Sequence, residues 1–412
     1  MSNNQYTLKD LLTIKNGTDY KELSDGNIPV YGTGGIMRYV DDFLYDGESI
    51  LLPRKGTLSN ICYTNGKFWT VDTMYWTIVN EDLAYPKFLY CYLSLLDLSH
   101  RDSGSTLPSM TFDSYYSIPI DLPPMKVQKL VGDFIFKLNK KIENNNKINA
   151  ELESAAKTIY DYWFLQFEFP NEEGKPYKSS GGKMVWNEEL KREIPEGWNL
   201  DIINNAIEQI VDNRGKNPSK YYEAEKYPVI DNFLIKNTPY PSMSEVKRYI
   251  NQDLYDNFLR TYNRKNDVII TLVGNGIGNV SLIPSDKVAI IQNTIALRCN
   301  EKISNFYLYF YCINNNKLIK ALDRGSSQPS IKASDIFSLK ILFPDQNISK
   351  RYKKLCTSIF NKILENCKEN QELIKLRDFI LPLLMNGQIG FKDNLNEEIE
   401  HKEVEQREFS NI

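Results

Sequence analysis

Two long stretches of the chain carry hydrophobic residues at steps of three and four, the spacing that places them on one face of a helix. The first stretch covers residues 125–164, and its hydrophobic positions, on either side of a polar middle, are Val127, Val131, Phe134, Leu138, Ile142, Leu152, Ala155 and Ile159. At a rise of about 1.5 Å per residue, about forty residues span roughly 60 Å, which is longer than a small domain is wide. The pattern therefore predicts a long helix that lies against a second long helix.

The second helix is predicted 221 residues further along the chain. An offset of 221 carries the first hydrophobic stripe onto another one, at Ile348, Tyr352, Leu355, Ile359, Ile363, Leu373, Leu376 and Ile380. The same offset places GSTLPSMTFDSYYSIPIDLPP, which begins at Gly104, over GSSQPSIKASDIFSLKILFPD, which begins at Gly325. One offset shared by two kinds of segment indicates an internal repeat of two halves, each a globular region followed by a long helix.

The polar middle of the stripe is repeated as well. Asn145 and Asn149 interrupt the first stripe, and the offset of 221 carries them onto Asn366 and Asn370. We expect these amides to pair across the two helices, while the alternative is a solvated gap where the helices part. On this pattern alone, replacing Asn145 and Asn366 by Leu is expected to raise the thermal midpoint of the chain.

The two globular regions have the pattern of mostly β domains. In the first, short runs rich in aromatic and β-branched residues, such as ESILLP and FWTVDTMYWTIV, are separated by glycine turns. In the second, NDVIITLVGNGIGNV aligns with GESILLPRKGTLSNI of the first, so that Asn279 falls on Asn60. We therefore expect an α+β fold in which two mostly β domains are each followed by a long helix, and the helices pair as an antiparallel coiled coil with pseudo-two-fold symmetry.

The expected segments follow from these patterns and from composition. Residues 169–195 are rich in Gly, Pro, Ser and charge, which is typical of a flexible linker. The expected boundaries are 1–122 (first domain), 123–168 (first helix), 169–195 (linker), 196–342 (second domain), 343–391 (second helix) and 392–412 (acidic tail).

Composition is that of a multidomain globular protein, with 412 residues, 42% of them hydrophobic and 25% charged. Six cysteines without a C-x-x-C pair, no signal peptide and no apolar run of roughly 20 residues predict a cytoplasmic chain without a membrane span. With only two histidines and no paired cysteines, no metal site is expected.

The net charge of −3 is unevenly distributed along the chain. After Lys392, seven acidic residues stand against two basic ones, a balance of −5, so that residues 1–392 carry +2. The charge of the main part therefore neither supports nor excludes a nucleic-acid partner. The tail is expected to be a solvated extension.

Loops of both globular regions combine glycines with cationic, hydroxyl and amide side chains, the groups that contact phosphates and base edges of DNA. Candidate DNA-contacting residues are Arg38, Arg54, Lys55, Thr57, Asn60, Ser105 and Thr106 in the first region and Arg214, Lys216, Asn275, Asn279, Arg324, Ser326 and Ser327 in the second. The alternative for any one loop is an exposed turn that binds nothing. The basic pair of the first region has no counterpart in the second, as expected of two readers of different sequences, whereas two copies of a catalytic domain would share their reactive groups.

Sequence patterns for catalysis are incomplete. NTPY at 237–240 lacks the second proline of the Asn-Pro-Pro-Tyr loop of adenine methyltransferases, and no glycine-rich cofactor loop follows a strand. GNGIGN does not have the G-x-G-x-x-G spacing, and SSGGKM does not have the spacing of a P-loop. No acidic pair beside a lysine repeats in the way a metal-dependent nuclease would require. We therefore expect no catalytic residue and no cofactor.

Several segments together form a pattern that spans nearly the whole chain: PVYGTGGIMRYVDD, LYDGESILLPRKGTLSN, the segments that begin at Gly104 and Gly325, and LPPMKVQKLV. A further segment, IYDYWFLQFEFPNEEGKPYKSSGGKMVWNEELKREIPEGW, is the most specific of them. On these segments the chain resembles the specificity subunits of type I restriction-modification enzymes, and the last one is similar to the central conserved region of that family. The chain departs from the family pattern at Asp345, which replaces the equivalent of Pro124, and at Lys126, where a glutamate is expected.

This resemblance implies two target recognition domains, each reading one half of a split DNA site, held apart by two antiparallel helices that also dock the methyltransferase subunits. It implies that the chain is not an enzyme, and that adenine-N6 methylation and cleavage belong to partner subunits. The expected partners are double-stranded DNA, two methyltransferase subunits and, through the complex, restriction subunits. Two alternatives remain at this point: a self-sufficient methyltransferase or nuclease with fused reading domains, and a coiled-coil scaffold without a DNA role.

Overall fold

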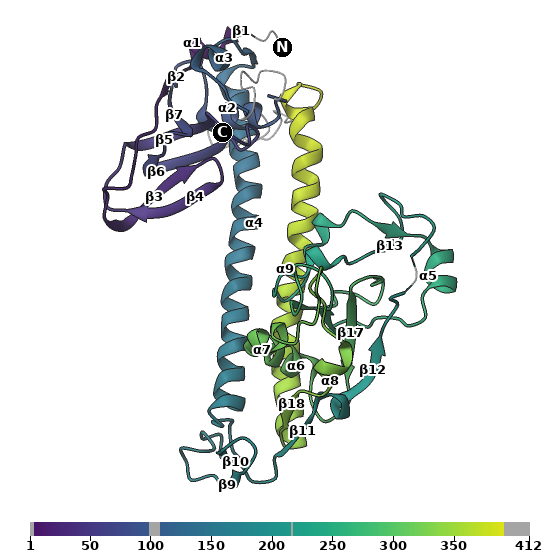
Figure 1. Cartoon of the computed structure of the whole chain (residues 1–412). Helices are drawn as coiled ribbons and strands as arrows, with labels where there is room; N and C mark the ends of the chain where they lie inside the picture. Colours follow the sequence, from purple (N-terminus) through teal and green to yellow (C-terminus); the bar gives the residue numbers. More distant parts are fainter. Residues whose placement is uncertain (1–3, 99–107, 216, 391–412) are drawn as a thin grey trace, which may run out of the picture. The chain divides into compact units, whose positions relative to one another are not determined.

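The chain divides into two compact units in the computed structural model, which describes residues 4–98, 108–215 and 217–390. Unit 1 comprises residues 1–142 and 373–412, and unit 2 comprises residues 143–372. Both divisions fall inside a long helix, because α4 (Met125–Tyr160) and α9 (Gln346–Met385) each contribute one part to each unit (Figure 1). The prediction of a long helix after each globular region is confirmed.

Unit 1 is built on a six-stranded sheet with the strand order β2-β7-β5-β6-β3-β4. Most neighbours in it are antiparallel, but β3 and β6 pair in parallel. A separate antiparallel pair joins β1 to β8. The strands are β1 (Asn4–Thr7), β2 (Leu12–Lys15), β3 (Asp25–Gly32), β4 (Gly35–Val40), β5 (Tyr45–Pro53), β6 (Cys62–Thr70), β7 (Met74–Val79) and β8 (Pro119–Leu122), and the short helices are α1 (Leu8–Leu11), α2 (Pro86–Ser94) and α3 (Phe112–Tyr116).

Unit 2 is built on a four-stranded sheet with the order β12-β17-β15-β16, in which every neighbouring pair is antiparallel. Its strands are β9 (Met184–Asn187), β10 (Arg192–Pro195), β11 (Asn199–Ile202), β12 (Ile207–Val211), β13 (Tyr227–Pro228), β14 (Tyr249–Ile250), β15 (Val268–Thr271), β16 (Val280–Leu282), β17 (Thr294–Cys299) and β18 (Lys340–Phe343). Its short helices are η3 (Ile203–Ala206), η4 (Asn232–Leu234), η5 (Met243–Glu245), α5 (Gln252–Phe258), α6 (Asn305–Asn314), α7 (Asn316–Lys320) and α8 (Ala333–Phe337).

The internal repeat is visible in the elements just before each long helix. The offset of 221 carries α3 onto α8 and β8 onto β18, residue for residue. The first strand of each domain pairs with these strands in the same way, since β1 is antiparallel to β8 and β11 is antiparallel to β18. In each domain, the first strand therefore pairs with the last strand, which directly precedes the long helix.

The first domain is attached to α4 by a buried glutamine. The Gln128 carboxamide oxygen accepts the backbone N–H of Tyr85 at 2.8 Å, and its nitrogen donates to the carbonyls of Leu83 at 3.2 Å and Pro123 at 2.9 Å. Around it, apolar residues of α4 and of α2 form one core with the last turns of α9, through Val131, Ile135, Phe88, Leu89, Leu384 and Met385. Since a buried amide left unpaired costs about 1–3 kcal/mol, this three-bond arrangement favours one position of the domain along the helix.

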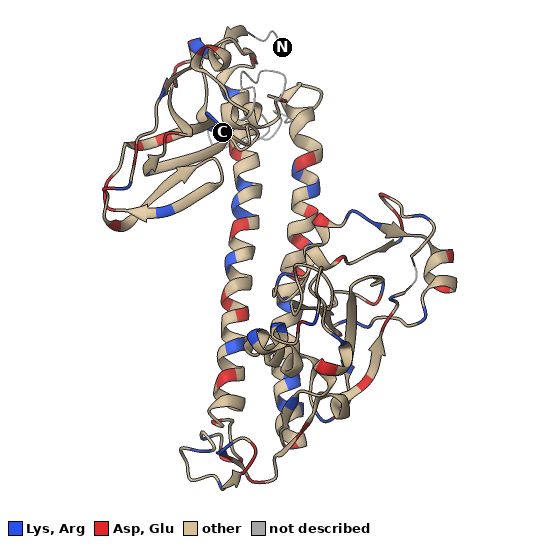
Figure 2. Ribbon diagram, viewed as in Figure 1, with Lys and Arg blue, Asp and Glu red and all other residues tan. Residues whose placement is uncertain are grey.

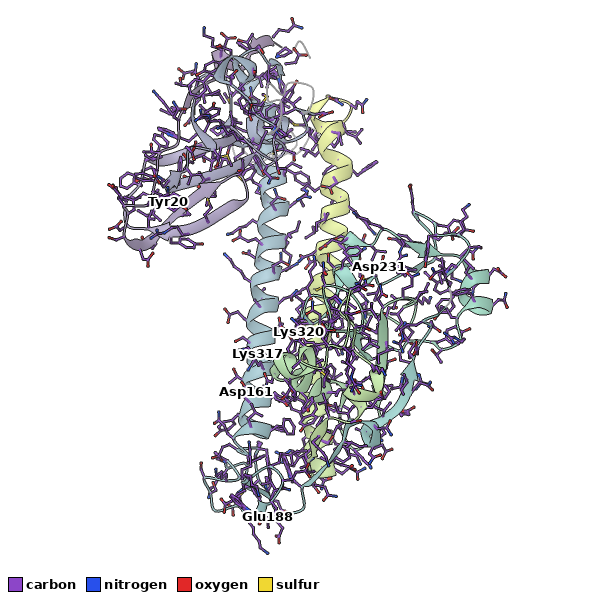
Figure 3. All side chains as sticks on the ribbon, in the orientation of Figure 1. Tyr20, Asp161, Glu188, Asp231, Lys317 and Lys320 are labelled. Carbon is purple, nitrogen blue, oxygen red and sulfur yellow. The ribbon has the colours of Figure 1, made fainter. Side chains whose placement is uncertain are left out.

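The second domain is attached to both long helices by aromatic packing. Phe164, in the π-helix η2 (Asp161–Leu165) that continues α4, lies 4.8 Å from Tyr352 of α9 and 4.5 Å from Tyr307 of α6 between ring centroids. Asp161, labelled in Figure 3, accepts a hydrogen bond from the Asn314 amide of α6 at 3.1 Å. Each edge-to-face ring pair adds about 0.5–1.5 kcal/mol to the gain from burial, so this cluster firmly attaches the domain to the helices.

The predicted pairing of amides across the two helices is confirmed within unit 2. The Asn145 nitrogen donates to the Asn370 carboxamide oxygen at 2.9 Å, and the Asn366 nitrogen donates to that of Asn149 at 2.9 Å. Asn145 and Asn366 are 2% and 3% exposed, so the amides are buried and not part of a solvated gap. The paired residues fall in opposite order along α4 and α9.

Residues 169–195, which composition predicts to be a flexible linker, are instead folded. The segment contains the hairpin of β9 and β10, in which Val185 is paired with Ile194. Phe169 is buried and stacks on Tyr177 at 4.5 Å and on Trp198 at 5.4 Å. The prediction of a flexible linker was wrong because aromatic side chains of this segment, which are spaced among Gly, Pro and Ser in the sequence, are buried against the second domain.

Among the helices that the structure describes, none is long and apolar enough to cross a membrane.

Candidate nucleic-acid interface

In unit 1, three loops meet at one edge of the six-stranded sheet, beyond the end of β5. The Gly56 N–H donates to the Pro108 carbonyl at 2.8 Å, and the Met110 N–H donates to the Arg54 carbonyl at 3.0 Å. The Asn60 side-chain nitrogen donates to the Thr33 carbonyl at 2.8 Å. We call residues 31–35, 54–60 and 108–110 the first contact edge.

In unit 2, three loops meet at one edge of the four-stranded sheet in the same way. The Gly274 N–H donates to the Pro329 carbonyl at 2.9 Å, and the Ile331 N–H donates to the Leu272 carbonyl at 2.8 Å. The Asn279 side-chain nitrogen donates to the Ile235 carbonyl at 3.0 Å. We call residues 231–237, 272–279 and 328–331 the second contact edge.

The shared hydrogen bonds correct the alignment of the middle loops by one residue. The sequence places Gly274 over Lys55, but the bond to the proline carbonyl places Gly274 over Gly56. Both glycines have left-handed backbone, with φ of 98° and 93°, which glycine adopts without strain. Asn279 still corresponds to Asn60, so the second domain has one more residue between the glycine and the asparagine, and this extra residue is Asn275.

The cationic candidates of the first domain have different positions. Lys55 and Thr57 are exposed, and the Arg54 guanidinium is partly exposed, donating to the Asp72 carbonyl at 3.3 Å. These three lie on the first contact edge. Arg38 instead lies on β4 and forms an ion pair of 2.6 Å with Asp25. Because its guanidinium already has a carboxylate partner, it is less available for a phosphate than Arg54 or Lys55.

The two arginine candidates of the second domain are paired with carboxylates. Arg214 pairs with Asp212 through two hydrogen bonds, of 2.9 and 2.7 Å, and this guanidinium is the main reason that the pKa of Asp212 lies below its usual value. Arg324 pairs with Asp335 at 2.8 Å. Ser326 and Ser327 are exposed in the turn that leads to the second contact edge. Ser105, Thr106 and Lys216 lie outside the described residues.

Asn60 and Asn279 are placed as structural residues of the loops. Each donates its amide across to the neighbouring loop, and the Asn279 oxygen also accepts from the Asn237 amide at 3.2 Å. Their equivalence in sequence is therefore explained by an equivalent hydrogen bond. Asn275, by contrast, is exposed at the tip of its loop.

Several exposed residues of the second contact edge and its surroundings were not among the sequence candidates. Gln328 and Phe233 are exposed on its outer loops. Lys317 and Lys320 are exposed on α7, whose backbone lies against Gly278, and Figure 3 labels both. Figure 2 shows that basic and acidic residues are interspersed along the ribbon, so no continuous basic stretch marks these positions in the sequence. In the described part of the chain, no cluster of three metal-ligating side chains occurs.

The domain, its three-loop framework and the long helix that follows it each occur twice in the chain. The family model described as "Type I restriction modification DNA specificity domain" matches residues 2–154 and again residues 201–375, which together are more than half of the chain. The chain therefore belongs to the DNA specificity family of type I restriction-modification systems. Each match contains one contact edge and the larger part of one long helix. The expectation that this chain is not the catalytic subunit is confirmed by its family.

Relatives and a solved structure agree with this membership. The type I restriction enzyme MjaIX specificity subunit of Methanocaldococcus jannaschii is 24% identical over 94% of this chain and 93% of its own length. The HindI specificity subunit of Haemophilus influenzae is 24% identical over 75% of this chain and 79% of its own length. A crystal structure of a type I restriction-modification S subunit from M. genitalium has a TM-score of 0.63 at 15% identity, and the match covers 93% of this chain and 96% of that one. This last similarity shows a common fold.

Proposed function

We propose that the two contact edges read the two halves of a bipartite site in double-stranded DNA, and that the chain directs methyltransferase and restriction subunits to that site in the cytoplasm. The observation that carries the proposal is the same three-loop framework built twice, with the same hydrogen bonds and different exposed side chains. A framework fixes loop backbones, while the exposed groups determine which base edges they fit. Two frameworks with different groups suit two different half-sites. We propose residues 1–122 and 196–342 as the two reading domains.

We further propose that α4 and α9 form an antiparallel coiled coil that relates the two readers by a pseudo-two-fold axis. The hydrogen bond from Asn145 to Asn370 and that from Asn366 to Asn149 change places under the offset of 221, as such an axis requires. The bond from Asn370 to Asn146 has its counterpart in the contact of Asn149 with the Cys367 sulfur. Readers related in this way meet a duplex in opposite orientations, which suits half-sites separated by unread bases.

The helices also offer docking positions for two methyltransferase subunits, one on each repeat. Large apolar side chains remain exposed along them, among them Leu130, Ile148, Leu355, Leu376 and Phe379.

The proposal is tested with the chain assembled with its methyltransferase subunits. Sequencing of modified bases in the host genome should give one split motif, and the complex should bind that motif with an affinity that falls steeply with salt, because phosphate contacts dominate. Exchanging residues 1–122 for the first domain of a related subunit should change one half of the motif only. A motif that changed in both halves would contradict independent readers, and methyl transfer by the chain alone would favour a self-sufficient methyltransferase. An assembled complex without DNA binding would favour the scaffold alternative.

A further inference from the structure

Three exposed side chains come from neighbouring loops of the second contact edge: the amides of Asn275 and Gln328 and the ring of Phe233. The bond between Gly274 and the Pro329 carbonyl joins the residues next to the two amides. The Asn232 side chain donates to the Val273 carbonyl at 3.4 Å, which holds the loop of Phe233 against the same point. Phe233 is 46% exposed, although it is a large apolar side chain.

The two amides differ from the other amides of this edge. Asn237 and Asn279 use their side chains to tie loops together, since Asn237 accepts the Val280 N–H at 2.9 Å and Asn279 donates to the Ile235 carbonyl at 3.0 Å. Within the described residues, Asn275 and Gln328 form no side-chain hydrogen bond, and both are exposed. Each therefore presents a donor and an acceptor to a ligand.

The two arginine candidates of this domain are held by carboxylates, as is Lys236, which lies on the edge itself and pairs with Glu245 at 2.8 Å. Arg324 is paired with Asp335, and Arg214 with Asp212, so neither guanidinium presents a free fork to the O6 and N7 atoms of a guanine. Lys317 and Lys320 are exposed on α7 beside Gly278, where they suit phosphate contacts that carry no sequence information.

We infer that the second domain recognises A·T base pairs in the major groove, with Asn275 and Gln328 on adenine edges and Phe233 on a thymine methyl group. The carboxamide of Asn or Gln matches the N6 donor and N7 acceptor of adenine, and an aromatic ring fits the C5 methyl group of thymine. The first contact edge instead exposes Arg54 and Lys55, whose donors match guanine. This inference rests on the proposed function, because it assigns base chemistry to one of the two proposed half-sites.

The test uses the assembled complex and duplexes that carry its motif. The half-site of the second domain is the one that stays unchanged when residues 1–122 are exchanged. In that half-site, each adenine other than the methylated one is replaced by 7-deazaadenine, which lacks N7, and each thymine by uracil, which lacks the methyl group. We expect at least one replacement of each kind to lower affinity by about tenfold, while the same replacements in the other half-site have smaller effects.

Substitutions connect these effects to residues. Asn275→Asp and Gln328→Glu keep the shape of the side chain but remove its donor, so each should weaken binding about tenfold and abolish sensitivity to one 7-deazaadenine. Phe233→Ala should abolish sensitivity to one uracil. The matched control is Asn144→Asp, an exposed amide on α4, which should leave binding unchanged. Lys320→Gln should weaken binding to all sequences alike and reduce the salt dependence.

Each other outcome overturns the inference. A second half-site whose only A·T pair carries the methylated adenine, or variants that keep full sensitivity to the modified bases, would show that other groups read this half-site while leaving the proposed function intact. A complex that binds no split motif would remove the proposed function and the inference with it. Thermal unfolding of each variant shows whether a loss of binding is a loss of folding.

Discussion

At the first contact edge the Gly56 N–H donates a hydrogen bond to the Pro108 carbonyl, and at the second contact edge the Gly274 N–H donates one to the Pro329 carbonyl. On these matching backbones the first edge exposes Lys55 and a partly exposed guanidinium, whereas the second exposes amides and a phenyl ring. The hydrogen bonds that hold the loops use backbone groups and a few asparagine side chains, namely Asn60 at the first edge and Asn232, Asn237 and Asn279 at the second. The remaining side chains can therefore differ between the two repeats while the loop framework stays the same.

The largest expected effect comes from moving a loop between the edges. Replacing residues 54–60 by residues 272–279 keeps the backbone partners of the loop, Pro108 and Met110, so we expect the domain to fold. Affinity for the original site should fall more than about 100-fold, because several base contacts of the first half-site are lost together.

Binding and modified-base sequencing measure this loss. The reciprocal exchange, in which residues 54–60 replace 272–279, is the control and should affect only the second half-site. An unchanged motif after either exchange would show that these loops do not read bases.

A second test uses the helix pair, where the two repeats match most closely. Replacing Asn145, Asn149, Asn366 and Asn370 together by Leu removes both partners of the two buried hydrogen bonds, Asn145 to Asn370 and Asn366 to Asn149. We expect the free energy of unfolding to rise by about 1–4 kcal/mol. Replacing only Asn145 and Asn366 would instead leave the carboxamide oxygens of Asn370 and Asn149 without these donors, at a cost of about 1–3 kcal/mol. Urea unfolding of both variants should therefore give changes of opposite sign, and changes of the same sign would reject the pairing.

Replacing Arg54 by Ala tests directly how the first contact edge differs from the second. If Arg54 reads a base, its removal should weaken binding by about 1–3 kcal/mol and relax specificity at one position of the first half-site. Arg38→Ala is a matched control, because Arg38 is paired with Asp25 on β4 and should have a smaller effect. Titration at moderate salt measures the affinity of both variants. Equal losses of affinity for Arg54→Ala and Arg38→Ala would show that the two arginines do not differ in their contribution to binding.

The smallest effect is expected for the asparagines that both edges share. Asn60→Ala removes one hydrogen bond between loops and Asn279→Ala removes two, and we expect the free energy of unfolding to fall by about 1 kcal/mol for each bond lost. Each should also weaken binding to its own half-site. A loss of stability in one variant alone would show that the two frameworks are less alike than their hydrogen bonds indicate.

The long helices and the repeat were predictable from sequence because both depend on local periodicity and on one offset. The contact edges were predictable only in part, because loops that meet through Gly56 and Pro108, or through Gly274 and Pro329, are distant in sequence. Because the loop of the second domain is one residue longer, the sequence alignment did not place Gly274 over Gly56. The amides of Asn145 and Asn366 were expected to be buried, but the residues with which they pair depend on the register between the helices. The change in stability on replacing only two of the four asparagines depends on that register as well.

One consequence of the helix arrangement concerns the time course of synthesis. The core of unit 1 includes Leu384 and Met385 beside Val131 and Ile135, so this core is completed only after residues 143–372 have been made. At about 5–20 residues per second, translation of that intervening segment takes roughly ten to fifty seconds. During this interval the nascent first domain exposes the apolar surface of α4 that Leu384 and Met385 later cover.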